Sequence, residues 1–131
     1  MAAPARILIV EDEQIIAADL RNKVMRLGHN VVGMAIAGDE AISMAERLKP
    51  DLVLMDVQLE GPMSGTQAAR TIQERSRTPI VFITAFPGIF VREPGQMQQP
   101  GICLAKPFSR IQVEAALNAA LGSVPPSPGP N

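Results

Sequence analysis

Several apolar runs of this sequence end in side chains that can do chemistry. In chain order, these runs end in Glu11 and Asp12, in Asp56, in Thr84 and in Lys106. If the runs are strands of one parallel sheet, their carboxyl ends meet at the same edge of that sheet. We therefore expect three carboxylates, a hydroxyl and an ammonium group to lie within a few ångströms of one another.

Crowded carboxylates of this kind need a positive partner. Mutual repulsion raises the pKa of at least one of them unless a counter-charge is present. A hard divalent cation supplies that charge, and Mg²⁺ prefers one or two carboxylates, a carbonyl and several waters. The residues therefore predict a magnesium site whose protein ligands are Glu11, Asp12, one oxygen of Asp56 and the backbone carbonyl of Gln58.

The same residues could perform phosphoryl transfer. With one oxygen of Asp56 on the metal, the other oxygen is free to attack phosphorus. Thr84 can donate a hydrogen bond to one phosphoryl oxygen, and Lys106 can pair with another. Taken singly, each residue has an ordinary explanation, such as an acidic helix start or a surface lysine. Their conjunction at the ends of the runs is what indicates a site.

The elements that must position these residues follow from the hydrophobic pattern. Five strands are expected, over residues 7–10, 31–37, 52–55, 79–83 and 102–105. Helical periodicity predicts helices over 14–27 with Gly28 as a left-handed cap, 41–48, 66–75 and 111–121. The apolar stripe of the first helix includes Ile15, and that of the last helix includes Ile111.

Strands that alternate with helices predict a parallel sheet covered on both faces, an α/β doubly wound sandwich. Right-handed connections favour the strand order 2-1-3-4-5, which places the binding crevice between the first and third strands. From Ala85 to Gly101 repeated Pro and Gly leave at most a short turn over 88–93, so the fourth helix is expected to be short or missing. The expected organisation is an N-terminal tail over 1–5, one domain over 6–121 and a disordered Pro-rich tail over 122–131.

Composition excludes several classes of protein. The 131 residues carry a net charge of −1, with 47% hydrophobic and 19% charged residues, which is typical of one globular domain. No apolar run approaches the roughly 20 residues of a membrane span, and no secretory signal precedes the first strand. With the single cysteine Cys103, this favours a cytoplasmic protein. Without Trp or Tyr, and with scattered basic residues, direct binding of nucleic acid is not expected.

The motifs resemble those of the receiver domains of two-component response regulators. The resemblance covers about residues 5–121 and is carried by Ile7-Leu8-Ile9-Val10-Glu11-Asp12, Leu52-Val53-Leu54-Met55-Asp56, Ile83-Thr84-Ala85 and Ala105-Lys106-Pro107-Phe108. It implies a CheY-like fold in which Asp56 accepts a phosphoryl group from the phosphohistidine of a sensor histidine kinase. It implies that Glu11 and Asp12 hold Mg²⁺.

The resemblance also gives roles to the remaining residues of the set. It implies that Thr84 and Lys106 sense the phosphoryl group, and that the Lys106–Pro107 bond is cis. Three departures from the family pattern stand out. The segment 58–65 is one residue longer than the commonest form, and Cys103 stands where the family usually has an aromatic residue or histidine.

The third departure concerns residues 79–87 and the broken fourth helix, which look most like the receivers of bacterial general-stress regulators. Those regulators carry a sigma-factor-like domain before the receiver, whereas only six residues precede the first strand here. The simplest expectation is a single-domain response regulator that signals to an unknown downstream protein or passes its phosphoryl group onward. Thr84 and the loop over 85–101 are the expected switch element.

Two alternative functions remain open. One is a small Mg²⁺-dependent phosphatase with Asp56 as nucleophile, although Gln58 has no titratable proton for general acid–base catalysis. The other is a degenerate receiver that acts only in protein interaction. The favoured hypothesis is a phosphoacceptor signalling domain and not an enzyme. A homodimer is a further possibility, because the missing helix could expose Ile89, Phe90 and Val91.

Overall fold

The five strands are built from the aliphatic runs of the sequence. The structure, a computed structural model, describes residues 4–85 and 102–122. β1 (Arg6–Val10), β3 (Leu52–Asp56) and β4 (Ile80–Thr84) are buried along nearly their whole length, as expected of strands covered on both faces. β2 (Asn30–Ala35) and β5 (Ile102–Ala105) form the two edges of the sheet and are less buried.

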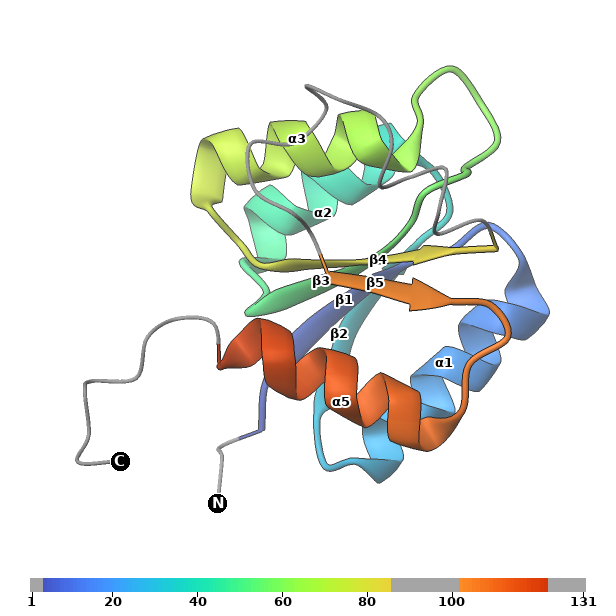
Figure 1. Ribbon diagram of the computed structural model, residues 1–131. Coiled ribbons are helices and arrows are strands. Elements are labelled where there is room, and N and C mark those ends of the chain that lie inside the picture. Colours follow the sequence, from blue (N-terminus) through green and yellow to red (C-terminus); the bar gives the residue numbers. More distant parts are fainter. Residues whose placement is uncertain (1–3, 86–101, 123–131) are drawn as a thin grey trace.

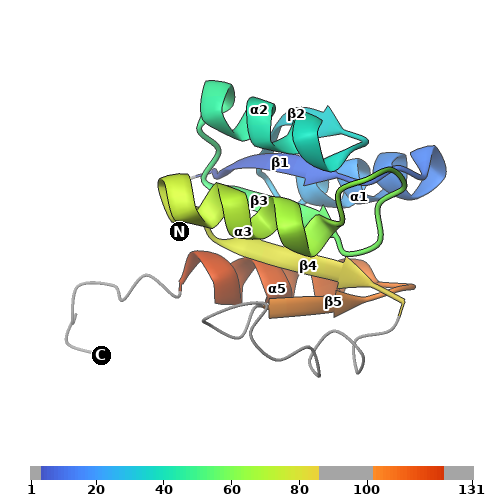
Figure 2. The same ribbon diagram turned by 90° about the horizontal axis from the view of Figure 1, so that it is seen from above.

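All five strands pair in parallel in the order β2-β1-β3-β4-β5, which Figure 2 shows along the sheet. This confirms the predicted doubly wound topology. The helices of the described residues are α1 (Gln14–Arg26), α2 (Gly38–Leu48), α3 (Gly65–Ser76) and α5 (Arg110–Leu121). In Figure 1, α2 and α3 cover one face of the sheet, and α1 and α5 cover the other.

Two hydrophobic layers hold these elements together. Ile7 and Ile9 of β1 point into the layer beneath α1 and α5, whereas Leu8 and Val10 point into the layer beneath α2 and α3. The same alternation runs along β3 and β4, because neighbouring strand residues face opposite sides. The ends of β1, β3 and β4 are therefore fixed from both sides. A rigid sheet of this kind gives side chains at the strand ends a defined place.

The expected helix cap is present, but two large side chains of the predicted apolar stripes are exposed. Gly28 has a φ of 93°, the left-handed conformation that its position after α1 predicts. Ile15 and Ile111, by contrast, are 86% and 73% exposed, so their assignment to the buried faces of their helices was wrong. Both lie in the first turn of a helix, at its second residue.

Some sequence predictions concern residues outside the described ranges. The short or missing fourth helix, the switch loop after Ala85 and the apolar residues Ile89, Phe90 and Val91 lie within 86–101, and most of the expected C-terminal tail lies within 123–131. Within the described residues, no helix combines the length and the apolar character needed to cross a membrane.

Candidate functional site

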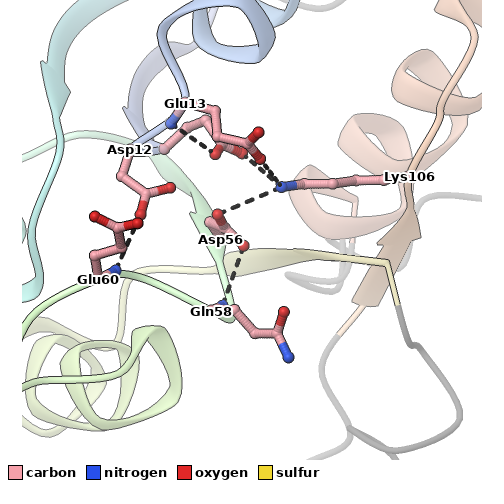
Figure 3. Close-up of polar contacts among 7 residues, drawn as sticks. Asp12, Glu13, Asp56, Gln58, Glu60 and Lys106 are labelled. Carbon is pink, nitrogen blue, oxygen red and sulfur yellow. Dashed lines mark hydrogen bonds and ion pairs between the residues drawn. The ribbon is translucent and has the colours of Figure 1, made fainter.

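The predicted site residues come together at the carboxyl ends of the strands. Asp56 is the last residue of β3 and pairs in register with Ile83, the neighbour of Thr84 at the end of β4. Glu11 follows β1, and Lys106 follows β5. Figure 3 shows the side chains of Asp12, Asp56 and Lys106 close together at this edge. The predicted residues therefore lie at the carboxyl ends of four strands, at one edge of the sheet, as the sequence indicates.

Three carboxylates form the centre of the site. Glu11 and Asp56 are 1% and 2% exposed, and Asp12 is half-buried beside them. One carboxylate oxygen from each of the three lies within 4.8 Å of the others. Such proximity of acids is costly in a buried place unless positive charge is nearby.

Lys106 supplies the positive charge. Its Nζ lies 3.1 Å from Oε1 of Glu11 and 3.4 Å from Oδ2 of Asp56. Burial alone lowers the pKa of Lys106, but the contact with the Glu11 carboxylate and the charge of Asp56 outweigh it, so the pKa is raised above its ordinary value. The lysine therefore stays protonated and is shared between two buried acids. Its backbone N–H donates to the carbonyl of Thr84 at 2.9 Å, which ties β5 to β4.

Glu11 is the acid whose charge is least well compensated. Burial, together with the hydrogen bond and the charge of Asp56, raises the pKa of Glu11 to about 7. Its Oε1 is buried, and although Lys106 is near enough for an ion pair, this oxygen has no hydrogen-bond partner of good geometry. A buried oxygen in that state is a ready ligand for a cation.

These observations fit a small hard dication. The donor set consists of carboxylate oxygens, which Mg²⁺ prefers over nitrogen or sulfur ligands. A cation among Glu11, Asp12 and Asp56 would satisfy the orphaned Oε1 of Glu11 and offset the repulsion within the cluster. The residues present could therefore hold Mg²⁺.

The segment between β3 and α3 closes the site from one side. The backbone N–H of Gln58 donates to Oδ1 of Asp56 at 3.1 Å, and that of Glu60 donates to Oδ2 of Asp12 at 3.0 Å. In Figure 3 the side chain of Gln58 extends away from Asp56. The additional residue expected in this segment therefore leaves contacts with both acids intact.

Gly65, at the start of α3, fixes how near this segment lies to the end of β3. Its N–H donates to the carbonyl of Val57 at 2.9 Å. A Cβ atom at this position would lie 1.8 Å from the backbone carbonyl oxygen of Asp56. Glycine is therefore required here for steric reasons, a requirement that the sequence analysis did not foresee.

Thr84 and Cys103 occupy different environments. Thr84 is 2% exposed at the end of β4, beside the site, whereas Cys103 is half-buried and packs against the layer beneath α2 and α3. Burial raises the pKa of the Cys103 thiol. The Lys106–Pro107 peptide bond is cis, as the family resemblance implies.

Glu13 was missed by sequence reasoning. Its Oε1 lies 3.6 Å from Nζ of Lys106, and its backbone N–H donates to Oε2 of Glu11 at 3.1 Å. An acid that opens a helix has a sufficient local explanation, which hid this contact. The available signal was its place directly after two acids already assigned to the site. Its side chain is 65% exposed, so the ion pair is weak.

Comparison with known proteins agrees with this geometry. The family model described as "Response regulator receiver domain" matches residues 7–118. The chain is 41% identical over 116 residues to the Phyllosphere-induced regulator PhyR of Methylorubrum extorquens, covering 88% of this chain and 43% of that regulator. The predicted resemblance to receivers of stress regulators is thereby confirmed.

Two solved structures are similar in fold. The receiver domain of the PhyR response regulator from Erythrobacter litoralis has a TM-score of 0.81 at 34% identity, over 91% of both chains. The anti-anti-sigma factor PhyR from Bartonella quintana has a TM-score of 0.79 at 37% identity, over 92% of this chain and 49% of that one. The chain thus spans about half the length of the full-length regulators that it matches.

Proposed function

Since the chain belongs to the response regulator receiver domain family, we propose that it is a phosphoacceptor switch whose acceptor is Asp56. The observation that carries the proposal is the position of the Asp56 carboxylate. It is buried at the end of β3, has acidic neighbours that could hold a cation, and lies 3.4 Å from a lysine ammonium. This is the arrangement that attack on a phosphorus atom requires.

In the proposed reaction, a carboxylate oxygen of Asp56 attacks the phosphorus of a donor. For a phosphohistidine donor, the new O–P bond forms as the N–P bond breaks, and the released imidazole nitrogen takes up a proton. Lys106 stays charged and pairs with a phosphoryl oxygen, while the hydroxyl of Thr84 donates to another. The Gln58 N–H holds Oδ1 of Asp56 in place. The acyl phosphate remains on the protein.

Glu11, Asp12, Asp56 and the backbone carbonyl of Gln58 are the proposed ligands of Mg²⁺. When bound, Mg²⁺ neutralises charge on the incoming phosphoryl group. Lys106 cannot do this alone, because it already compensates two buried carboxylates. Protonated Glu11 must lose its proton before it binds the cation, so the site should load better above pH 7 than below it.

Gln58 favours a switch over a phosphatase. Rapid hydrolysis of an acyl phosphate at Asp56 would need a general acid–base group near the attacking water. The residue two positions after Asp56 is an amide that cannot transfer a proton in this way. A degenerate receiver that acts only by protein interaction is the other alternative, but its site would not need the complete set of charged residues.

The partners follow from this role. We propose a sensor histidine kinase as donor and a separate protein as the reader of the phosphorylated state, in the cytoplasm. One similar solved protein is described as an anti-anti-sigma factor, which supports a regulator of transcription as the class of reader. The proposed domain extends over 6–121, with tails over 1–5 and 122–131. The formation of a homodimer is a further part of this proposal.

The experiment is intact mass spectrometry after incubation with Mg²⁺ and a small acyl phosphate. We expect one added phosphoryl group in the wild type, and none in Asp56→Asn or in the presence of a chelator. If a histidine kinase labels a wild type that the small donor does not, the acceptor function still holds. If neither donor labels it, the protein is a degenerate receiver and the proposal fails.

A further inference from the structure

Phe108 links the phosphoryl-binding lysine to α1. It lies two residues after Lys106, in the turn that connects β5 to α5. Its half-buried ring packs against the hydrophobic layer beneath α1 and α5. The Nζ atom of Lys23 lies 5.6 Å from the centroid of this ring, within the range of a cation–π interaction.

The ammonium group of Lys23 is itself held in place. Its Nζ lies 2.6 Å from both carboxylate oxygens of Asp19, one helical turn earlier on α1. The Lys23 side chain is 21% exposed, against 51% for that of Asp19. Because the lysine is largely withdrawn from water, its attraction to the ring of Phe108 is stronger than at an exposed site.

The simpler explanation of Lys23 does not account for its position over the ring. A cation in the last turn of α1 interacts favourably with the helix dipole, and an acid four residues earlier forms an ordinary helix pair. Arg26 is also a cation in the last turn, and it is exposed. The dipole explanation applies equally to both residues, whereas among the cations of the described residues only Lys23 lies over the ring of Phe108.

We propose that Lys23 is a positioning residue for Lys106 and acts through Phe108. By holding the ring against α1, it restricts movement of the turn over 106–109 and keeps the Lys106 ammonium within reach of Asp56. The inference rests on the function proposed above for Lys106. It means that a contact on α1, away from the three acids of the site, also determines the phosphorylation rate.

The first test measures the turn directly. Backbone order parameters from ¹⁵N relaxation would be compared among wild type, Lys23→Met, Lys23→Arg and Arg26→Met. Methionine retains an apolar stem without the charge, whereas arginine retains a cation that can stack on the ring. We expect the order parameters of Lys106 and Phe108 to fall in Lys23→Met only. Unchanged values in that variant would overturn the proposal.

The second test measures the chemistry. Under Mg²⁺ and a small acyl phosphate, Lys23→Met should form the acyl phosphate about three- to fivefold more slowly, the factor expected of one such contact. Lys23→Arg and Arg26→Met should keep the wild-type rate. In a Lys106→Met background the Lys23→Met change should have no further effect. An undiminished effect in that background would show that Lys23 acts by another route and would overturn the proposal.

These two measurements separate the inference from the proposed function. If the wild type accepts no phosphoryl group from any donor, the proposed function fails, and the order parameters still decide whether Lys23 holds the turn. If the wild type is phosphorylated but Lys23→Met changes neither the order parameters nor the rate, only the inference fails. Thermal unfolding of each variant, measured alongside, identifies any general loss of fold.

Discussion

The ammonium nitrogen of Lys106 lies 3.1 Å from Oε1 of Glu11, nearer than the 3.4 Å that separates it from Oδ2 of Asp56. One cation is thus shared between an acid proposed to bind Mg²⁺ and the acid proposed to take the phosphoryl group. A change in the charge of Glu11 therefore alters how strongly Lys106 pairs with Asp56, and a change in the charge of Asp56 alters its pairing with Glu11.

The stability of the protein without divalent cations should depend on pH through Glu11. The pKa of Glu11 is about 7 in the folded state and 4.5 as a free side chain, so between these values the folded state binds more protons than the unfolded state. The contribution of Glu11 to the free energy of unfolding is therefore complete below about pH 4.5. It is lost as the pH rises to about 7, and the loss is on the order of 3 kcal/mol. Urea unfolding in a chelating buffer from pH 5 to pH 8 measures it.

Glu11→Gln provides the control for this pH dependence. The amide is uncharged at every pH, so the variant should be more stable than the wild type at pH 8 and should lack this part of the pH profile. Added Mg²⁺ should stabilise the wild type at pH 8 and have a much smaller effect on the variant. An identical pH profile in both proteins would contradict the pKa shift.

Lys106→Met should slow formation of the acyl phosphate by about a hundredfold, because the developing phosphoryl charge loses a preorganised ammonium partner. Lys106→Arg is the matched variant. It keeps the positive charge, but its planar guanidinium cannot take the position of the ammonium, which lies 3.1 Å from Glu11 and 3.4 Å from Asp56. We expect it to recover only part of the rate. Intact mass against time measures both. A wild-type rate in Lys106→Met would exclude a role for this lysine.

Gln58→Asp tests the distinction between switch and phosphatase. A carboxyl group two residues after Asp56 could transfer a proton to and from an attacking water, so the acyl phosphate should hydrolyse at least about tenfold faster. Gln58→Asn changes the side-chain length without adding a carboxyl, and should stay within a few-fold of the wild type. The decay of phosphorylated protein after removal of the donor gives the lifetimes. Equal lifetimes in all three proteins would show that hydrolysis is limited elsewhere.

Gly65→Ala should destabilise the fold far more than Gly61→Ala. The new Cβ at position 65 would lie 1.8 Å from the Asp56 carbonyl oxygen, so the backbone must move, at a cost of about 2–3 kcal/mol or more. Gly61 has a φ of 105° but no atom within 4 Å of the new Cβ, so its change should cost about 1 kcal/mol. Denaturant unfolding compares the two. A similar loss in both would mean that the segment after β3 can relax around residue 65.

The fold could be predicted because its signals are local. Two-sided burial requires an unbroken aliphatic run, and the runs that became β1, β3 and β4 are visible in the sequence without reference to any other residue. The exposure of Ile15 and Ile111 could not be predicted in this way. Helical periodicity defines a face, but it does not say how far toward the start of the helix that face is covered by other residues.

The sequence by itself determined the strand order and the identity of the acids, the hydroxyl and the lysine at the strand ends, because parallel topology brings those ends to one edge. The tertiary structure alone decided how their charges are shared: that Lys106 pairs with Glu11 and Glu13 as well as with Asp56, that Glu11 holds its proton up to about pH 7, and that Gly65 lies against Asp56. Charge sharing and steric contact depend on distances of a few ångströms between residues far apart in the chain. Such distances are fixed by packing and leave no pattern in the order of residues.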